Sequence, residues 1–518
     1  MTQLATSSAD PQARERFLRR SAAMLAMLAV GMIYRAETLT DWDSWDYAAQ
    51  AIQGHSSDLL LGRWWFIATM RGAYLLGHHV LRLPMLEGYL AMQMACAFIM
   101  AAALAVLMAW TYRLTKSAAA EVIVAGLILP GPLIGIYATA VMTEGLTVLM
   151  IGLAFLLWQR AIEAEPSAAR IWALIGGACF GVAADIREPA ALLCAWPIIS
   201  CLVDRPKHRW QLLALAVGGC ILTLGLGIAA AQAWYPWPRG LLENIKIWSA
   251  SMAGEREKFP VPPMQNLSLL AQYAMGTAPV LALLVVPALV WAALRCRRMF
   301  YLGLSALPYA ASLVANHDLV VNPRFVLPLM WILAPVAAAG IAATVVRFSG
   351  RYRLRLAAAL LTVVISGGMM VWSKAGMIQH YYFGFVDSQR RIYDSMLDMP
   401  EDSAVVAGPG TPVAMYLNRL RMKDFEIVAS GWMWPDGDLK RVLGRYLDEG
   451  RDVYVNCDSN DWLRTYRKSG EWDTLLEAIR DYQVEDAGPP MVRLIKLQAD
   501  GGTVTAKTLS HEEQEQRH

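Results

Sequence analysis

Apolar segments of about twenty residues recur along the first two-thirds of the chain, and short loops rich in Lys and Arg separate them. A segment of this length can cross a hydrocarbon core of roughly 30 Å. The spacing predicts about eleven transmembrane helices, the first over residues 21–34 and the last over residues 356–372. Residues 119–158 must turn back once, because one helix of that length would span about 60 Å at ~1.5 Å per residue.

The strongly basic short loops all fall on one side of this predicted topology. Lys and Arg concentrate in cytoplasmic loops, so this side is predicted to be cytoplasmic. The basic N-terminus then lies inside, and the protein is a multi-pass protein of the cytoplasmic (inner) membrane whose C-terminal part is extracytoplasmic. The basic segments are residues 14–20, 113–116, 205–209, 295–298 and 347–355.

From about residue 373 the pattern changes to short apolar runs that alternate with amphipathic stretches. This alternation predicts a small α/β domain. Its strands are expected over residues 404–407, 425–429, 453–456 and 492–497, and its helices over residues 413–420, 439–448 and 461–479. The expected fold class is therefore a mainly α polytopic membrane protein with a small α/β C-terminal extracytoplasmic domain. We expect a transmembrane module over residues 1–372 with outer loops at about 37–85 and 234–275, an α/β domain over 373–498, and a polar, disordered tail over 499–518.

Composition agrees with a membrane protein and argues against several soluble classes. Hydrophobic residues make up 56% of the chain and charged residues only 17%. A net charge of +3 over 518 residues gives no support for nucleic-acid binding. The seven cysteines and eight histidines show no paired spacing typical of a metal site, so a metal requirement stays open.

The first predicted outer loop contains three acids among aromatic residues. Asp41, Asp43 and Asp46 are interleaved with Trp45 and Tyr47. A carboxylate at the membrane surface can act as a general base toward an acceptor hydroxyl or amine. The structural alternative is a helix that Asp43 or the following serine caps, with the aromatic rings as interfacial anchors.

Three further charged residues fall at outer turns. Glu144 follows a threonine before an apolar segment, and it suits either a helix N-terminus or a substrate site. Arg187 and Arg324 lie on the outer side, against the positive-inside trend, so each requires a local reason. A guanidinium group binds phosphate through two nitrogen atoms at once, whereas the alternative is an internal ion pair of Arg187 with Glu144 or Glu188. His317 is close to Arg324 in sequence and is a further candidate for substrate binding.

These motifs together resemble those of the GT-C superfamily of membrane glycosyltransferases, in particular the protein O-mannosyltransferases and the lipid A aminoarabinose transferases. The segment Asp43-Ser44-Trp45-Asp46-Tyr47-Ala48 is similar to the acidic motif of their first outer loop, although Ser44 replaces the second acid. Thr143-Glu144, Arg187-Glu188-Pro189 and the span that opens at Arg324 follow in the same order. The spacing Asp41-Trp42-Asp43 also resembles the metal-associated DxD of oligosaccharyltransferases, so a divalent cation is a possible cofactor.

The resemblance implies an inverting glycosyltransferase that moves a sugar from a polyprenyl-phosphate donor to a glycan, lipid or protein acceptor. Asp43 is then the candidate base, with Asp46 and Asp41 as competitors, and Arg187 and Arg324 bind the donor phosphate. Glu144, Tyr47, His317 and Trp45 are candidate substrate contacts, and membrane lipids surround the module. The alternatives are a transporter or flippase of a lipid-linked saccharide, which the many spans support, and a non-catalytic polysaccharide assembly subunit with a Trp-rich outer surface.

Overall fold

The chain divides into two compact units, Met1–Phe383 and Gly384–His518. The structure is a computed structural model that describes residues 11–39, 42–56, 61–234, 240–258, 262–315, 323–348, 384–428, 439–459, 471–488 and 490–495. Asp41, His317, the predicted last span and the predicted C-terminal tail lie outside the described residues. The predicted domain boundary at 372/373 also falls there, so it stays a prediction.

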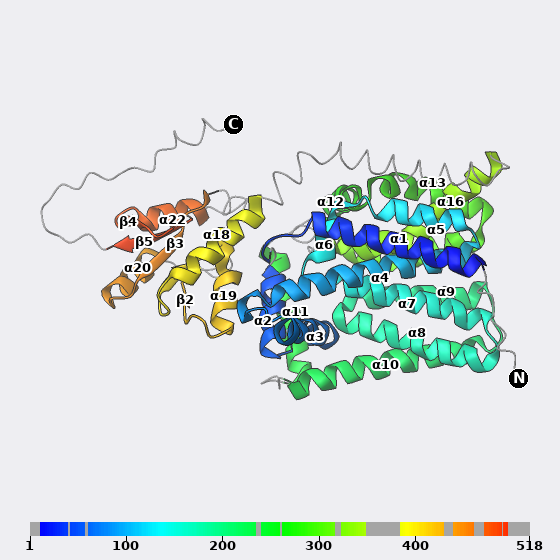
Figure 1. Cartoon of the computed structure of the whole chain (residues 1–518), viewed down its shortest axis with the longest axis horizontal. Helices are drawn as coiled ribbons and strands as arrows, with labels where there is room; N and C mark the ends of the chain where they lie inside the picture. The colour runs from blue at the N-terminus through cyan, green and yellow to red at the C-terminus, as the bar shows by residue number, and fades with distance from the viewer. Residues whose placement is uncertain are drawn as a thin grey trace, which may run out of the picture. The chain divides into compact units, whose positions relative to one another are not determined.

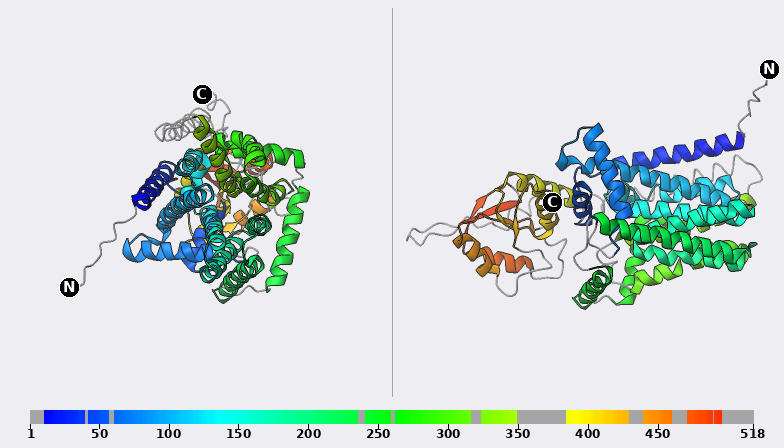
Figure 2. Two further views of the ribbon diagram at one scale, coloured as in Figure 1. Left: turned by 90° about the vertical axis from the view of Figure 1, so that its right-hand side faces the viewer. Right: turned by 90° about the horizontal axis from the view of Figure 1, so that it is seen from below.

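Unit 1 is a bundle of helices in which neighbours in sequence often pack side by side. Helix α8 packs against both α7 and α10, α7 packs against α4, and α4 packs against α1 (Figures 1 and 2). The long helices of the first half are α1 (Pro11–Ile33), α4 (Tyr89–Thr115), α7 (Glu144–Glu163), α8 (Pro166–Ile186) and α10 (Arg209–Trp234).

Shorter helices connect and cap these long ones. Proline occupies the first turn of α6, α8, α12 and α13, where its missing N–H costs no hydrogen bond. The shorter elements are α2 (Trp42–Gln53), α3 (Trp64–Val80), η1 (Met85–Glu87), α5 (Ala118–Ile128), α6 (Pro132–Thr139), η2 (Glu188–Cys194), α9 (Ala195–Val203), α11 (Leu241–Lys258), α12 (Pro263–Thr277), α13 (Pro279–Arg295), α14 (Arg297–Ser305), α15 (Leu307–Ala315), η4 (Pro323–Val326) and α16 (Leu327–Phe348).

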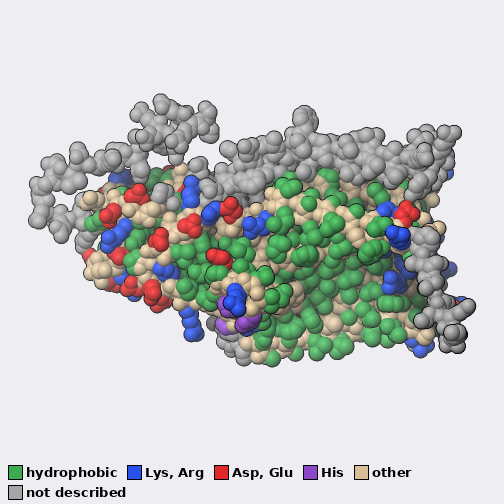
Figure 3. Space-filling model, in the orientation of Figure 1, with side chains coloured by type: hydrophobic (Ala, Val, Ile, Leu, Met, Phe, Trp, Pro, Cys, Tyr) green, Lys and Arg blue, Asp and Glu red, His purple; other side chains and the backbone are tan. Residues whose placement is uncertain are grey.

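The described part of unit 1 contains several helices suited to a bilayer. Five of them are long and apolar enough to cross a membrane, and the number rises to seven if each of two bent helix pairs is one span. The two pairs are α5 with α6, bent by 79°, and α12 with α13, bent by 116°. Figure 3 shows a broad hydrophobic surface over this unit, with Lys and Arg gathered at the end where α1 begins. The count of eleven spans stays a prediction.

Glycine lets α8 and α10 approach closely. A Cβ atom added at Gly177 would lie 1.9 Å from the backbone oxygen of Ala216, and one at Gly219 would lie 2.2 Å from that of Leu174. Such distances are possible only because neither residue has a side chain, and small residues are typical of close helix contacts in membranes. This close contact at Gly177 and Gly219, the glycine seam, holds α10 tightly against α8.

Unit 2 is a small α/β fold around one mixed sheet. The strand order is β2-β1-β3-β5-β4, in which β1 pairs in parallel with β2 and β3, and β5 pairs antiparallel with β3 and β4. The strands are β1 (Ala404–Val406), β2 (Glu426–Ile427), β3 (Val453–Asn456), β4 (Gln483–Asp486) and β5 (Met491–Ile495), and the helical elements are α18 (Gly384–Asp398), η6 (Gly408–Gly410), α19 (Thr411–Arg419), α20 (Leu439–Asp448) and α22 (Glu471–Ile479).

The sequence pattern located most of unit 2 but missed one helix, α18, and one strand, β4. It predicted strands at the positions of β1, β2, β3 and β5, and helices at those of α19, α20 and α22. Strand β4 was not predicted because all four of its residues are exposed and three of them are polar, so no apolar alternation marks it. A mostly helical protein with a small C-terminal sheet is therefore confirmed.

Candidate active site

The acidic segment of the first outer loop forms the start of α2. Asp43 lies in the first turn and keeps 30% of its side chain exposed. Trp45 and Tyr47 are fully buried, and the Tyr47 ring packs edge-on against Phe66 of α3 with 5.3 Å between the ring centroids. In this structure the two aromatic side chains anchor α2, and their assignment as substrate contacts stays a prediction.

Asp43 belongs to a cluster of charges with three other predicted site residues. One terminal nitrogen of Arg324 donates to an Asp43 carboxylate oxygen at 2.5 Å. The Nε atom of the same arginine lies 3.3 Å from Oε1 of Glu144. Arg187 donates from Nη1 to that same Oε1 atom. Four charged residues that are far apart in sequence thus form one connected group.

This cluster is almost completely removed from solvent except at one carboxylate. The side chain of Glu144 is fully buried, and those of Arg187 and Arg324 are 6% and 5% exposed. Two buried arginines and two carboxylates balance to zero net charge, which limits the cost of desolvating them. The exposed part of Asp43 is the open side of the group.

Helix ends account for the placement of two of these charges. Glu144 is the first residue of α7, where the helix dipole favours an anion, and Arg187 is the C-cap of α8, where it favours a cation. Arg324 lies in the 3-10 helix η4, between Pro323 and the start of α16. Glu144, Arg187 and Arg324 therefore each lie at or next to the end of a helix, and these helix ends meet at one side of the bundle.

Phe325 adds an aromatic surface to the cluster. The guanidinium carbon of Arg187 lies 3.7 Å from the centroid of the Phe325 ring, and that of Arg324 lies 5.4 Å from it. A cation close to an aromatic ring is stabilised by the ring quadrupole. The ring thus helps to hold both arginines, a role that was not predicted for Phe325 from its place next to Arg324 in the sequence.

The cluster still has unused hydrogen-bonding capacity. Among the described residues, Oε2 of Glu144 and Nε of Arg187 are buried without a hydrogen-bond partner. The free N–H of Arg187 suits a phosphate oxygen, because a guanidinium group can donate to two oxygens at once. The arrangement can accordingly bind an anion beside an accessible carboxylate.

Asp46 lies one turn after Asp43 and accepts a hydrogen bond from Nε2 of Gln50 at 2.6 Å. Asp43 pairs directly with Arg324, so geometry favours Asp43 as the acid of the cluster. Within the described residues, no group of three His, Cys, Asp or Glu side chains is arranged to hold a metal ion. Metal dependence therefore stays open.

Asp185 is a further buried acid for which the sequence pattern suggested no role. It is fully buried, and its Oδ2 atom accepts a hydrogen bond from the backbone N–H of Trp65 at 3.2 Å. It therefore fixes the first turn of α3, whose preceding residue Arg63 lies over the Tyr47 ring at 5.5 Å. The sequence does contain a sign of this residue, because Asp185 is an acid inside an apolar run, two residues before Arg187.

The chain matches no known protein family model, and no curated protein matches its sequence. Solved structures do match. ArnT from Cupriavidus metallidurans in the apo state is 14% identical, with a TM-score of 0.60 over 94% of this chain and 98% of that one. The same protein bound to undecaprenyl phosphate is 13% identical, with a TM-score of 0.60 over 92% of this chain and 97% of that one. The chain therefore has the same overall fold as ArnT.

A second kind of protein has a similar fold. An oligosaccharyltransferase from Archaeoglobus fulgidus, in complex with Zn and sulfate, is 12% identical, with a TM-score of 0.54 over 90% of this chain and 71% of that one. ArnT, a lipid A aminoarabinose transferase, and the oligosaccharyltransferase are both GT-C glycosyltransferases. At these identities the likeness is one of fold, and it agrees with a mostly helical protein that carries a small C-terminal sheet.

Proposed function

We propose that the protein is a membrane glycosyltransferase that transfers a sugar from a polyprenyl-phosphate donor to an acceptor, with inversion at the anomeric carbon. The observation that carries the proposal is the pair of buried arginines beside a partly exposed carboxylate. The GT-C fold supports it, and so does the undecaprenyl phosphate bound to ArnT, a protein of similar structure. We further propose that this site faces the outer side of the cytoplasmic membrane, with the N-terminus inside and unit 2 outside.

The donor phosphate would bind at Arg187 and Arg324. When the sugar leaves, the bond between its anomeric carbon and the phosphate oxygen breaks, and the phosphate keeps the electron pair. Guanidinium groups in a site shielded from water stabilise that developing charge without reorganising. Phe325 keeps both groups in position.

Asp43 would act as the general base. It accepts the proton of the acceptor nucleophile while the nucleophile attacks the anomeric carbon from the face opposite the phosphate. In the free protein Arg324 is paired with Asp43, so a phosphate that binds Arg324 loosens this pair. Donor binding would therefore release the base at the moment when it is needed.

The test uses the full-length protein in nanodiscs with undecaprenyl phosphate and a panel of undecaprenyl-phosphate sugars. We expect binding of undecaprenyl phosphate, and we expect Arg187→Gln and Arg324→Gln to weaken it, because each removes a guanidinium group. Arg113→Gln is the matched control, since Arg113 pairs with Glu163 at the other end of α7. Unchanged lipid affinity in both site variants would contradict the phosphate site.

The transfer assay separates the proposal from its alternatives. Labelled sugar should appear on an acceptor when the protein and a matching donor are present. A transporter or flippase would instead move the lipid-linked sugar across a bilayer without breaking its phosphate bond. Movement of intact donor with no transfer from any donor of the panel would refute the enzymatic proposal.

A further inference from the structure

Asp185 is a buried acid that the proposed mechanism does not use. Its Oδ2 atom accepts a hydrogen bond from the backbone N–H of Trp65, in the first turn of α3, at 3.2 Å. The N-cap residue of α3, Arg63, has a φ of 46° and forms no side-chain cap hydrogen bond. A carboxylate at a helix N-terminus is stabilised by the free N–H groups and by the helix dipole. Asp185 of α8 thus supplies the cap that the N-cap residue of α3 does not.

Helix α10 closes the same contact from another side. The indole N–H of Trp65 donates to the backbone oxygen of Thr223 at 3.2 Å. A Cβ atom added at Gly227 would lie 2.8 Å from Oδ1 of Asp185 and 2.9 Å from Nε1 of Trp65. The carboxylate is therefore confined between α3 and α10, and the absence of a side chain at Gly227 leaves the room that it occupies.

Helix α3 in turn holds α2, the helix that carries the proposed base. Tyr47, in the middle of α2, packs edge-on against Phe66 of α3. At the C-terminal end of α2, the backbone oxygens of Ala51 and Ile52 each accept a hydrogen bond from Nη1 of Arg71 at 3.0 Å. Contacts at two points along α2 fix its direction relative to α3.

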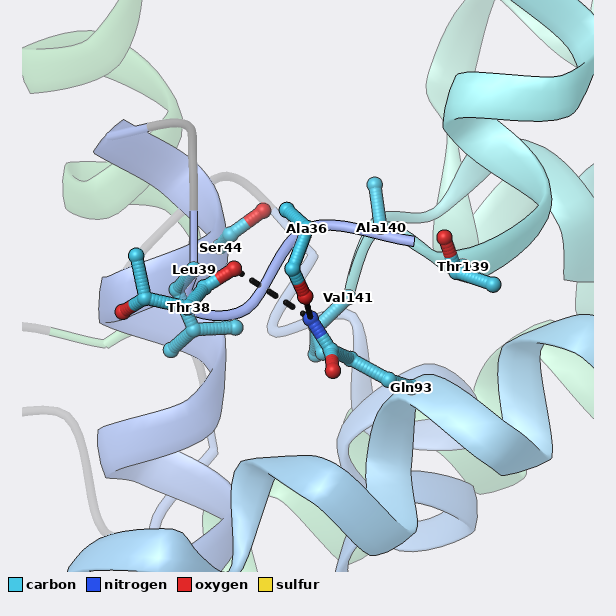
Figure 4. A pocket seen from close by; sticks show the side chains of 8 residues that line it. All are labelled: Ala36, Thr38, Leu39, Ser44, Gln93, Thr139, Ala140 and Val141. Carbon is cyan, nitrogen blue, oxygen red and sulfur yellow. Dashed lines mark hydrogen bonds between the residues drawn. The ribbon is translucent and has the colours of Figure 1, made fainter. Parts of the chain in front are cut away.

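The chain that enters α2 is held separately, by α4. The Nε2 atom of Gln93 donates to the backbone oxygens of Ala36 and Thr38, at 3.3 and 3.2 Å (Figure 4). These bonds fix the path by which the chain approaches α2. The contacts with α3 set the direction of α2, because they lie along the helix itself.

Two routes therefore connect the proposed base with the arginines of the charge cluster. The first is the direct ion pair of Asp43 with Arg324. The second runs from Asp43 through α2 and α3 to Asp185, which lies in the last turn of α8, two residues before Arg187. In the proposed function the donor phosphate loosens the first route, so the second route has to keep the base in place during the reaction.

We propose that Asp185 is a positioning residue, which keeps Asp43 aligned with the donor after the phosphate has displaced Asp43 from Arg324. The inference rests on the proposed function. Asp185 acts through Trp65 and α3, without contact with the substrate. Its loss should slow sugar transfer, because a general base has to lie within hydrogen-bond reach of the proton that it accepts. Binding of the donor lipid should persist, because both arginines remain.

The test measures the Kd for undecaprenyl phosphate and the single-turnover rate of transfer from undecaprenyl-phosphate sugars, on the full-length protein in nanodiscs. Asp185→Leu keeps the branched shape of the side chain but removes the acceptor oxygen. We expect the transfer rate to fall roughly 10- to 100-fold while the Kd changes by less than about twofold. Asp185→Asn keeps an acceptor oxygen for Trp65 and should stay within about threefold of the wild-type rate.

Ser200→Ala is the matched control for the loss of a buried hydrogen bond. It removes the bond from Nε1 of Trp158 to Oγ of Ser200, which joins α7 to α9. We expect this variant to have a lower Tm but the wild-type transfer rate. A drop in rate as large as that of Asp185→Leu would show that any buried hydrogen bond of the bundle has this effect, and it would overturn the inference.

Gly227→Ala tests the same contact without changing Asp185. The new methyl group would displace the carboxylate and the indole of Trp65, so the transfer rate should fall with the Kd unchanged. Gly225→Ala, on the same helix, adds a methyl group that meets no atom within 4 Å and should keep the wild-type rate. Hydrogen exchange of the first backbone amides of α3 should become faster in Gly227→Ala and Asp185→Leu than in the two controls.

The outcomes separate a positioning role from a purely structural one. Faster amide exchange in α3 with the wild-type transfer rate in Asp185→Leu would show that the cap serves the fold alone, and it would overturn the inference. An equal loss of transfer rate and of affinity for undecaprenyl phosphate would also overturn it, as would a failure of Asp185→Asn to retain the rate. Wild-type protein that transfers sugar from no donor contradicts the proposed function instead, and the positioning role falls with it.

Discussion

Replacing Asp43 by Asn should separate binding of the donor lipid from its turnover. In the free protein the carboxylate of Asp43 and a donor phosphate compete for Arg324, which is 5% exposed and pairs with Asp43 at 2.5 Å. Asn is nearly isosteric with Asp but carries no charge. Removing the competitor should therefore strengthen binding of undecaprenyl phosphate, although the same change removes the proposed base.

The size of the effect follows from the burial of the pair. Fully exposed pairs are worth ~0.2–1 kcal/mol, and a pair at 4 Å with an effective dielectric constant near 20 is worth ~4 kcal/mol. Asp43 is 30% exposed and Glu144 remains beside Arg324, so an intermediate value of about 1–2 kcal/mol is expected. This corresponds to an about 5- to 30-fold lower Kd for undecaprenyl phosphate. Loss of a general base should lower kcat by about 10²- to 10⁴-fold.

The assay measures binding of fluorescent undecaprenyl phosphate and single-turnover sugar transfer on the same nanodisc preparation. Glu163→Gln is the matched control, since it breaks a pair with Arg113 in which both side chains are about as exposed as Asp43. Asp46→Asn tests the competing assignment of the base. Weaker lipid binding by Asp43→Asn, or transfer at the wild-type rate, would refute the reasoning. Loss of turnover in Asp46→Asn alone would assign the role of general base to Asp46.

Three further predictions concern stability. Glu144→Gln should lower the Tm far more than Glu163→Gln, because it leaves Arg187 buried without its carboxylate at a cost of about 3–5 kcal/mol; equal shifts would contradict this account. Gly177→Ala should force α8 from α10 and destabilise by about 1–3 kcal/mol, whereas Gly218→Ala, which meets no atom within 4 Å, should keep the wild-type Tm in the same unfolding scan. Burial raises the pKa of the Cys457 thiol from its ordinary value of 9.0 to about 12. Between pH 9 and 12 the folded protein therefore keeps the thiol proton that the unfolded chain loses. The contribution of Cys457 to the free energy of unfolding is thus complete below pH 9 and disappears between pH 9 and 12. Chemical unfolding at pH 8 and 10.5 measures the loss, and Cys457→Ala should remove this part of the pH dependence.

The fold was largely predictable because length, charge and hydrophobicity act locally. The apolar runs and basic loops located most helices of unit 1, and apolar runs located four strands of unit 2. The pattern could not reveal the glycine seam, because Gly177 faces α10 only once the two helices are packed. It predicted a turn within residues 119–158, where α5 and α6 meet at 79°, but it did not show the bend of α12 with α13.

The candidate site was predictable in its residue types and not in its connections. Outer-side arginines and acids stood out against the positive-inside trend, and the structure brings Asp43, Glu144, Arg187 and Arg324 together. The ion pair of Arg187 with Glu144 was one of the alternatives left open. That Glu144 contacts both arginines depends on the three-dimensional packing of α7, α8 and η4. Short-range patterns carry no information on such contacts.

The order of these contacts along the chain has a consequence for biogenesis. Glu144 and Arg187 are 43 residues apart, whereas Asp43 and Arg324 are 281 residues apart. During synthesis from the N-terminus, the partner of Arg187 is already present when α8 is inserted, so this buried cation enters the membrane region together with its counter-ion. Asp43 is synthesised long before its partner Arg324, which lies in η4. The charge cluster is thus completed by a segment that is synthesised after α2, α7 and α8.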